Sequence, residues 1–286
     1  MKFSFSFLKI IIVLCSFNAA IAVAQNNIHP APELLLANSY HSGIELQHYW
    51  VSEKYDGVRA YWNGADFISR QGHIFPAPHW FKKPLPETAL DGELWLGRGK
   101  FAALSGLVRR QSPGAGDWDE IKFMVFDLPG SAEIFDRRLL QLKKIIADIN
   151  APHIQWVEQF KVSSHEALAE MLDAVVAQGA EGLMLHRGSS QYQNGRSDDL
   201  LKLKKYFDAE AVVTGYLPGK GKYQGMLGSL EVETADKKRF KIGSGFSDAE
   251  RKNPPAIGAI ITYKYFGLTV NGIPRFASFI RVRDSF

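Results

Sequence analysis

The alternation of hydrophobic and polar residues in the first half of the chain predicts short β-strands. Residues 60–62 and 67–69 flank the dipeptide Asn63-Gly64, which supplies the positive φ angles that a tight hairpin turn needs. A further strand is predicted over residues 121–128. This segment is an almost continuous apolar run, which is typical of a strand buried on both faces.

Two longer segments have the hydrophobic period of an amphipathic helix. In the first, apolar residues recur three and four positions apart from Phe135 to Ile149, with charged residues between them. The second is predicted to begin at Ser163, with Glu166 three residues later as its capping box. It is predicted to end at Gly179, because glycine readily takes the left-handed conformation that terminates a helix.

The pattern changes near residue 208, where short apolar runs alternate with Gly-rich turns and no long helical period remains. Five short strands in a segment of this size are typical of a small closed barrel of the OB type. The sequence therefore predicts an α+β domain with antiparallel sheets over residues 25–207 and an OB-fold domain over residues 208–286. The other predicted strands span residues 90–96, 182–186, 200–206, 211–216, 227–233, 239–242, 257–265 and 277–282, and the Pro- and Asn-bearing segment 26–38 is predicted to be irregular.

The N-terminus has the pattern of a secretory signal peptide. Lysines 2 and 9 flank a Phe-rich start, an apolar run follows over residues 10–17, and Ala22-Val23-Ala24 matches an A-x-A cleavage site. The apolar run is too short to span a bilayer comfortably, although an uncleaved amphipathic anchor is the alternative. We expect residues 1–24 to be removed and the chain to be periplasmic or secreted, with no membrane attachment after cleavage.

Composition adds little beyond a globular class. The chain has 286 residues, of which 46% are hydrophobic and 22% are charged. The formal net charge of +4 weakly favours polyanionic partners, but loss of Lys2 and Lys9 leaves 32 basic against 30 acidic side chains. The single cysteine, Cys15, lies in the same leader. The processed chain therefore has no disulfide and no cysteine ligand or nucleophile.

Ionisable residues and aromatic residues gather at the predicted strand ends of the first domain. Each group taken singly is also compatible with a surface turn, a half-buried strand or ordinary core packing. In chain order the groups are Lys54-Tyr55-Asp56-Gly57-Val58-Arg59, Ser69-Arg70-Gln71-Gly72, Asp91-Gly92-Glu93-Leu94, Phe123-Met124-Val125-Phe126-Asp127, Glu181-Gly182-Leu183-Met184 and Leu201-Lys202-Leu203-Lys204.

This ordered set resembles the motifs of the covalent nucleotidyltransferase superfamily, which contains ATP-dependent DNA ligases, RNA ligases and mRNA capping enzymes. The segment that begins at Lys54 matches the adenylylation motif of that superfamily at each defining position. The chain most resembles minimal bacterial ATP-dependent DNA ligases that carry an export signal and no additional DNA-binding domain. The resemblance extends to the tail, because the superfamily's second domain is also an OB fold.

The resemblance implies an ATP-dependent, Mg²⁺-dependent enzyme that forms a lysyl-AMP on Lys54 and uses it to seal nicks in duplex DNA. A lysine amine attacks phosphorus only when it is uncharged, and neighbouring cations would lower its pKa. The remaining roles follow from the same resemblance. Lys202 and Lys204 would contact the α-phosphate, and Phe126 would stack on the adenine. Glu93 would bind the ribose and support the metal site, and Glu181 would hold the Mg²⁺ ion through water. Arg59 and Arg70 would bind the 5′-phosphate of the nick, and Arg59 would also lie in the nucleotide pocket.

Basic residues of the tail are candidates for contact with DNA. Lys220 and Lys222 lie in a Gly-rich loop beside Tyr223, and a second basic cluster covers residues 237–241. A lysine-rich hairpin turn that serves solubility is the alternative for either loop. The terminal motif contains Arg275, Arg281 and Arg283, and the sequence leaves open which of these orients pyrophosphate and which contacts the DNA backbone.

Two other functions are compatible with parts of this pattern. An RNA ligase would use the same motifs, whereas the export signal argues against an intracellular capping enzyme. An OB-type nucleic-acid-binding protein without catalysis would need none of the ionisable residues of the first domain. Neither a stable protein partner nor an oligomer is implied, so we expect a monomer whose partner is nicked duplex DNA.

Overall fold

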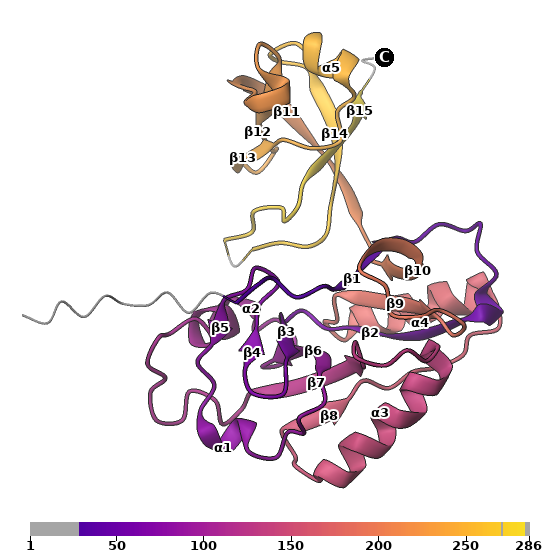
Figure 1. Ribbon diagram of the computed structural model, residues 1–286. Helices are drawn as coiled ribbons and strands as arrows, with labels where there is room; N and C mark the ends of the chain where they lie inside the picture. The colour runs from indigo at the N-terminus through magenta and orange to yellow at the C-terminus, as the bar shows by residue number, and fades with distance from the viewer. Residues whose placement is uncertain (1–28, 270, 284–286) are drawn as a thin grey trace, which may run out of the picture.

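The computed structural model describes residues 29–269 and 271–283. The predicted signal peptide and its cleavage site lie outside the described residues. Over the described ranges no helix is long and apolar enough to cross a membrane. The strands of this part of the chain form three sheets, two in the N-terminal part and one in the C-terminal part (Figure 1).

A six-stranded sheet forms the larger half of the first domain. Its strands run in the order β5-β4-β3-β6-β7-β8, antiparallel except for the β7–β8 pair. Large apolar side chains from this sheet and from three helices pack into one core. The elements are β3 (Val58–Trp62), β4 (Phe67–Ile68), β5 (Ile74–Phe75), α1 (His79–Lys82), β6 (Leu90–Trp95), α2 (Phe101–Leu107), β7 (Lys122–Asp127), α3 (Phe135–Ile149) and β8 (Ile154–Trp156).

A four-stranded sheet forms the other half, in the order β1-β10-β9-β2. Strand β1 pairs with β10 in parallel, and the remaining pairs are antiparallel. Apolar residues of helix α4 pack against one face of this sheet. The elements are β1 (Leu35–Ser39), the short 3-10 helix η1 (Leu46–His48), β2 (Tyr49–Lys54), α4 (His165–Ala177), β9 (Gly182–Arg187) and β10 (Gly195–Leu203).

The two-residue period of these strands separates core residues from functional ones. In the four-stranded sheet Val51, Leu185 and Leu201 lie directly opposite one another and pack in the core beside α4. The intervening positions place Ser52, Met184 and Lys202 opposite one another on the other face, since successive strand residues point to opposite sides. The face that carries Ser52, Met184 and Lys202 is turned toward the six-stranded sheet, and a cavity lies between the two sheets.

The C-terminal part is a five-stranded barrel in the order β13-β12-β11-β14-β15. A bridge between Ser244 and Ser278 links the segment after β13 to β15, and this contact closes the sheet on itself. Strand β11 leads out of the first domain, and the loop between β14 and β15 extends back toward it (Figure 1). The elements are β11 (Phe207–Pro218), the 3-10 helix η2 (Gly221–Tyr223), β12 (Leu227–Glu233), β13 (Arg239–Ile242), α5 (Asp248–Lys252), β14 (Ile260–Tyr265) and β15 (Ser278–Val282).

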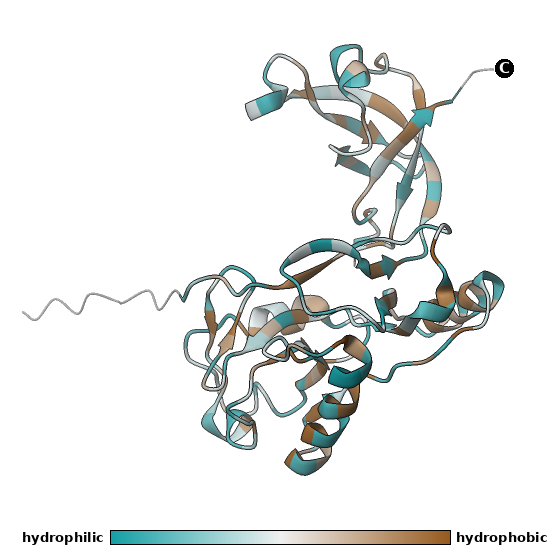
Figure 2. Cartoon of the chain, turned by 45° about the vertical axis from the view of Figure 1, so that its right-hand side comes forward, coloured by the Kyte–Doolittle hydropathy of each residue, from teal (hydrophilic) through white to brown (hydrophobic). Residues whose placement is uncertain are grey.

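Helix α3 has the bounds that its period predicted, and hydrophobic and hydrophilic residues alternate along it in Figure 2. The predicted start of helix α4 is wrong by one residue. Its N-cap is Ser164, whose hydroxyl accepts from the amide of Ala167 at 3.1 Å, so Ser163 and Glu166 form no capping box. The helix ends as predicted before Gly179, whose φ of 86° lies in the left-handed region.

Two local predictions, for the segment 26–38 and for the Asn63-Gly64 turn, are wrong. The segment 26–38 contains part of β1, which forms only by pairing with the distant β10. In the β3–β4 turn only Gly64 has positive φ, and Asn63 instead accepts hydrogen bonds from two backbone amides. Strand β7 is buried on both faces over Phe123–Val125, as predicted, and Phe126 near its end remains partly exposed. The short helices α1, α2 and α5 had no predicted counterpart.

Candidate active site

A cavity of about 370 Å³ lies between the two sheets of the first domain. Both sheets contribute to its lining through residues of β1, β2, β3, β6, β7, β9 and β10. Several residues that the sequence singled out line this cavity: Lys54, Arg59, Arg70, Glu93, Phe126, Lys202 and Lys204. The fold thus brings together segments that lie up to 150 positions apart in the chain.

Lys54 is the last residue of β2, and its ammonium group lies 2.5 Å from a carboxylate oxygen of Glu181. The second oxygen of that carboxylate pairs with Lys204, so one acid lies between two lysines. Both side chains of the Lys54–Glu181 pair are about one fifth exposed (23% and 20%). The sequence predicted neighbouring cations around Lys54, and the structure places the carboxylate of Glu181 in contact with it, with Lys204 on the other oxygen of that carboxylate.

Glycines allow the backbone to close tightly around this lysine. A Cβ atom on Gly57 would lie 2.3 Å from the carbonyl oxygen of Leu94, and one on Gly182 would lie 2.3 Å from that of Leu203. Gly182 also has a φ of 150°, which L side chains rarely adopt. Any larger residue at either position would push a strand away from the cavity that holds Lys54.

Glu93 lines the cavity from β6, directly opposite Arg59 on the neighbouring strand. Burial raises the pKa of its carboxyl group to about 8, and the negative charges of Glu181 and Asp91 act in the same direction. The positive charges of Lys54 and Arg59 only partly oppose this rise. A bound cation would remove the repulsion between these carboxylates, so Glu93 and Glu181 have the chemistry that a Mg²⁺ site requires.

Arg59 is held in place by a buried acid. Its guanidinium donates to both carboxylate oxygens of Asp91, at 3.0 and 2.6 Å, and to the carbonyl of Leu35 at 2.9 Å. The hydroxyl of Tyr192 donates to the same carboxylate at 2.7 Å. Burial works against the charge on Arg59, but the pKa of Arg59 is nevertheless raised because Asp91 is so close. The guanidinium carbon lies 5.4 Å from the centre of the Phe126 ring.

The position of Phe126 follows from a β-bulge. Asp91 pairs with Asp127 and Gly92 pairs with Val125, so Phe126 is the extra residue of β7 at the point where the register shifts. Val125 on the regular part of the strand is completely buried in the core. The bulge therefore turns an aromatic ring toward the cavity in a segment that otherwise has the composition of a buried strand.

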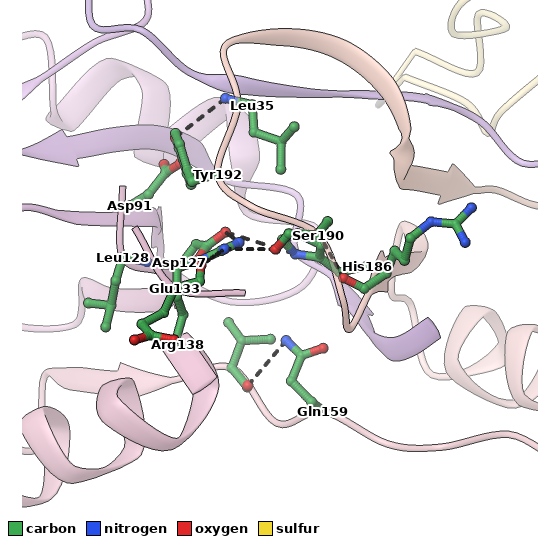
Figure 3. Close-up of polar contacts among 12 residues, drawn as sticks. Leu35, Asp91, Asp127, Leu128, Glu133, Arg138, Gln159, His186, Ser190 and Tyr192 are labelled. Carbon is green, nitrogen blue, oxygen red and sulfur yellow. Dashed lines mark hydrogen bonds and ion pairs between the residues drawn. The ribbon is translucent and has the colours of Figure 1, made fainter. Parts of the chain in front are cut away.

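A buried ion pair lies behind Phe126. Arg138 of α3 is completely buried and donates to both carboxylate oxygens of Asp127, at 2.6 and 3.1 Å. It also donates to the backbone carbonyls of Glu133 and Ser190, at 2.7 and 2.9 Å (Figure 3). Burial raises the pKa of Asp127, and the guanidinium opposes that rise. One side chain thus connects the end of β7, the start of α3 and the loop after β9.

Positively charged groups line the rest of the cavity. Lys202, on β10, has a pKa that is lowered by burial and by the nearby charges of Arg196, Lys204 and Lys54. Arg70 is exposed and follows β4 at the cavity edge. Basic groups that repel one another and have few acidic partners are stabilised by a bound polyanion.

The barrel contributes one basic residue to this region. Arg275, in the loop between β14 and β15, lies 3.8 Å from the carboxylate of Asp56, two residues after Lys54. The ammonium group of Lys204 lies 5.6 Å from the ring centre of Phe266 and 5.5 Å from that of Phe276, in the same loop.

The other tail residues that the sequence singled out are not near the cavity. Lys220 and Lys222 are exposed on the barrel between β11 and β12. Arg283 forms an ion pair with Glu210 of the barrel. Arg281 is exposed on β15, so Arg275 is the terminal-motif arginine that the structure places beside the first domain.

Sequence reasoning missed the residues that support the site from behind. Tyr192 and Arg138 had no local pattern that marked them, because they contact residues that lie far away in the chain, and Gln159 had none either. Asp127 and His186 lay inside or beside the quoted motifs, but nothing in their spacing indicated what they contact. A polar residue within an apolar strand, such as Asp127, was the one available signal.

Comparison with known proteins identifies the chain's relatives. The family model for the ATP dependent DNA ligase domain matches residues 35–204, and the model for the DNA ligase OB-like domain matches residues 218–283. The first of these covers more than half of the chain.

The chain belongs to the ATP-dependent DNA ligases.

Individual relatives agree with this assignment. A DNA ligase of Haemophilus influenzae is 36% identical over 249 residues, which cover 87% of this chain and 91% of that protein. A solved structure from a structure–function study of Lig E DNA ligases is 45% identical, with a TM-score of 0.82 over 88% of this chain and 99% of the other. The Chlorella virus DNA ligase–adenylate shares the fold, with a TM-score of 0.53 and 22% identity.

These likenesses confirm several predictions made from the sequence. The ATP-dependent DNA ligase resemblance is confirmed, and so is the α+β nucleotidyltransferase domain followed by an OB-like domain. The chain is therefore an ATP-using ligase, and RNA capping and binding without catalysis are not what its family does. The assignments of single residues to steps of the reaction remain predictions.

Proposed function

We propose that this ligase seals nicks in duplex DNA through an AMP group carried covalently on Lys54. Family membership supports the reaction, and the position of Lys54 supports the choice of nucleophile. Its amine is the basic group at the end of β2, it lines the cavity, and Glu181 contacts it at 2.5 Å. The observation that carries this assignment is the convergence of Lys54, Glu93, Phe126 and Lys202 on one cavity.

The reaction has three phosphoryl-transfer steps. The uncharged amine of Lys54 attacks the α-phosphorus of ATP, a nitrogen–phosphorus bond forms, and the bond to pyrophosphate breaks. The 5′-phosphate of the nick then takes the AMP and frees the lysine nitrogen. The 3′-hydroxyl finally attacks that phosphate, the phosphodiester bond forms, and AMP departs. Steps of this kind depend mainly on positioning and on charge neutralisation.

The charge and shape of the side chains around Lys54 suggest which step of the reaction each one serves. Glu181 is the closest acceptor for the proton that Lys54 must lose before it attacks. Lys202 on β10 and Lys204 just after that strand line the same cavity and suit the α-phosphate of the bound nucleotide. Phe126 presents a ring on which a base can stack. Arg70, exposed at the cavity edge, suits the 5′-phosphate of the nick.

Arg59 is better suited to the nucleotide than to free DNA. Its guanidinium already makes three hydrogen bonds to Asp91 and Leu35 and lies over Phe126. A side chain that is fixed in this way can present its remaining N–H groups with little loss of conformational freedom.

Glu93 and Glu181 are the residues that would hold Mg²⁺. The ion would neutralise phosphate charge, and most of its ligands would be water and phosphate oxygens, since Mg²⁺ seldom binds in an all-protein site. Within the described residues no group of three or more His, Cys, Asp or Glu side chains is placed to hold a metal ion.

Label transfer from ATP tests the assignment of Lys54. Protein incubated with Mg²⁺ and ATP labelled at the α-phosphate is expected to gain one labelled AMP, and Lys54→Ala to gain none. Lys54→Arg is also expected to gain none, because arginine does not lose its proton in proteins. Exposed Lys144→Ala is the control and should label like the unaltered chain. Label that persists in Lys54→Ala contradicts the assignment.

The strand preference is tested with matched nicked duplexes. We expect sealing of a DNA nick that is at least 10-fold faster than sealing of an all-RNA nick. Faster sealing of the RNA duplex would support an RNA ligase instead.

We also propose that the chain is exported and acts in the periplasm or outside the cell. The signal-peptide pattern that ends at Ala22-Val23-Ala24 supports this location. N-terminal sequencing of the protein made in a Gram-negative host is expected to begin at Gln25 in the periplasmic fraction. An intact Met1 on cytoplasmic protein would contradict the proposal.

A further inference from the structure

Two buried polar atoms that line the nucleotide cavity have no hydrogen-bond partner among the described residues. They are Oε1 of Gln159 and Nε2 of His186. A buried polar atom without a partner is costly, so such an atom at the wall of a cavity suits a ligand that supplies the missing hydrogen bond. Gln159 and His186 are both among the residues that line the cavity, together with Lys54 and Phe126.

The backbone places these two side chains on either side of strand β2. His186 lies directly opposite Trp50 on the β9 side, two residues after Met184 on the cavity face. On the other side Val51 exchanges two backbone hydrogen bonds with Phe160, at 2.8 and 2.7 Å, which fixes the segment that carries Gln159. Ser52 lies on the cavity face of the strand between them.

The imidazole of His186 is held in one orientation. Its ring stacks on Phe135, with the ring centres 3.6 Å apart and the planes 18° from parallel, and the residue is only 6% exposed. Nδ1 lies 3.9 Å from a carboxylate oxygen of Asp127, beyond hydrogen-bond distance, and the negative charge of that group favours the tautomer with its proton on Nδ1 and with Nε2 as the acceptor. Burial and the charge of Arg138 lower the pKa of His186 to about 3, so the ring is neutral.

The amide of Gln159 has a defined direction as well. Its Nε2 donates to the carbonyl oxygen of Val157 at 3.5 Å, while the Oε1 atom is left without a donor (Figure 3). The reversed amide would place two oxygens against each other, which is unfavourable. The cavity therefore presents two acceptors, from Gln159 and His186, near the aromatic ring of Phe126.

We propose that Gln159 and His186 read the base of the bound nucleotide and select adenine through its exocyclic amine. The amine carries two N–H donors, whereas guanine has a carbonyl oxygen at the same ring position and would face the acceptors with an acceptor. A site whose buried acceptors lose their donor discriminates strongly against the wrong ligand. This inference rests on the proposed function, because it concerns the nucleotide that Lys54 attacks.

Nucleotide analogues test the proposal on the unaltered chain. The rate of lysyl-AMP formation is compared with the rate at which purine riboside triphosphate, which has hydrogen in place of the amine, forms the corresponding lysyl-nucleotide adduct. We expect kcat/KM to be roughly 3- to 10-fold higher for ATP for each hydrogen bond that the amine makes. Equal rates for the two nucleotides would overturn the base-reading role while leaving ligation itself intact. Failure of both nucleotides to label the protein would instead contradict the proposed function.

Variants then assign the discrimination to each side chain. Gln159→Leu and His186→Phe are each expected to reduce the ratio of ATP to purine riboside triphosphate toward 1, mainly by lowering kcat/KM for ATP. Gln155→Leu is the matched control, because Gln155 donates to the carbonyl of Pro152 and is not among the residues that line this cavity. A variant that keeps the full ratio overturns the role of that residue, and thermal unfolding establishes that each variant is folded.

Discussion

Glu93 and Glu181 have the same functional group but very different surroundings. Glu181 pairs with Lys54 and Lys204, so its negative charge is balanced before any ligand binds. Glu93 has no ion pair among the described residues and faces the charges of Glu181 and Asp91. At the residue scale, it is the burial of Glu93 that is expected to appear in how the chain responds to pH.

The pKa of Glu93 predicts the pH dependence of stability. Its pKa is about 8 in the folded chain and near the ordinary 4.5 when unfolded, so between these values the folded state binds the extra proton. Stability from this group is therefore present at low pH and is lost as pH rises. Glu93→Gln should not lose this stability as the pH rises. The difference in unfolding free energy between Glu93→Gln and the unaltered chain should therefore grow in favour of the variant by up to about 1.4 kcal/mol per pH unit.

Urea unfolding across this range measures the difference. Exposed Glu158→Gln is the control, and its stability should follow that of the unaltered chain at every pH. If Glu93→Gln also runs parallel to the unaltered chain, the raised pKa of Glu93 is contradicted.

At the scale of elements, one side chain fixes how helix α3 meets the six-stranded sheet. Arg138 reaches Asp127 at the end of β7 and the carbonyl of Ser190 in the loop after β9. That loop also carries Tyr192, which donates to Asp91. The ion pair behind Phe126 and the acid that holds Arg59 are thus connected through one loop. A substitution in α3 that moves Arg138 is therefore expected to shift the residues that line the cavity.

Removal of Arg138 should be strongly destabilising. Arg138→Leu leaves the carboxylate of Asp127 buried without its partner, which typically costs about 3–5 kcal/mol of unfolding free energy. The double variant Asp127→Leu/Arg138→Leu should recover a large part of that loss, since neither charge then remains buried. Urea unfolding measures both values.

The neighbouring Arg137 provides the control for this experiment. It lies on the same helix but is exposed, so Arg137→Leu should change stability by no more than about 0.5 kcal/mol. A loss in Arg138→Leu no larger than that of Arg137→Leu would show that the ion pair does not stabilise the fold.

At the scale of the whole molecule, the two domains make contact where the chemistry is expected. Arg275 in the barrel approaches Asp56 beside Lys54, and Lys204 at the end of the first domain lies near Phe266 and Phe276. The barrel also presents Lys220 and Lys222 in an exposed loop well away from that contact. One part of the barrel is therefore available to the nucleotide and another to a long polyanion.

The exposed lysines predict how DNA binding depends on salt. If Lys220 and Lys222 each contact a phosphate, Lys220→Gln/Lys222→Gln should weaken binding to a nicked duplex. It should also reduce the slope of log K against log salt by roughly 1.8, because each phosphate contact contributes about 0.9. Fluorescence anisotropy at several salt concentrations measures this slope.

Two controls separate the loss of DNA binding from other effects: the rate of label transfer from ATP, and a substitution of a lysine outside the loop. The double variant should still form lysyl-AMP at the ordinary rate, because neither lysine lines the cavity. Exposed Lys144→Gln on α3 should leave the salt slope unchanged. An unchanged slope in the double variant would mean that the loop serves another purpose, such as solubility.

The sequence by itself determined the family and the order of most elements, and it marked several of the residues that line the cavity. These properties depend on local patterns: the period of Phe135 to Ile149 marks a helix, and the segment around Lys54 has a spacing that is rarely met by chance. Ranges such as β12 and β13 were predicted with their observed bounds because alternation and turn residues lie close together in the chain.

Tertiary structure alone decided which groups touch one another. Strand β1 exists only through its pairing with β10, the bulge at Phe126 depends on the register of β6 against β7, and the partner of Lys54 comes from a segment 127 positions away. The unpartnered atoms of Gln159 and His186 likewise became visible only when the two sheets faced each other. The physical reason is that a side chain's charge state and partners depend on burial and distance, and these are set by packing between segments that are remote in sequence.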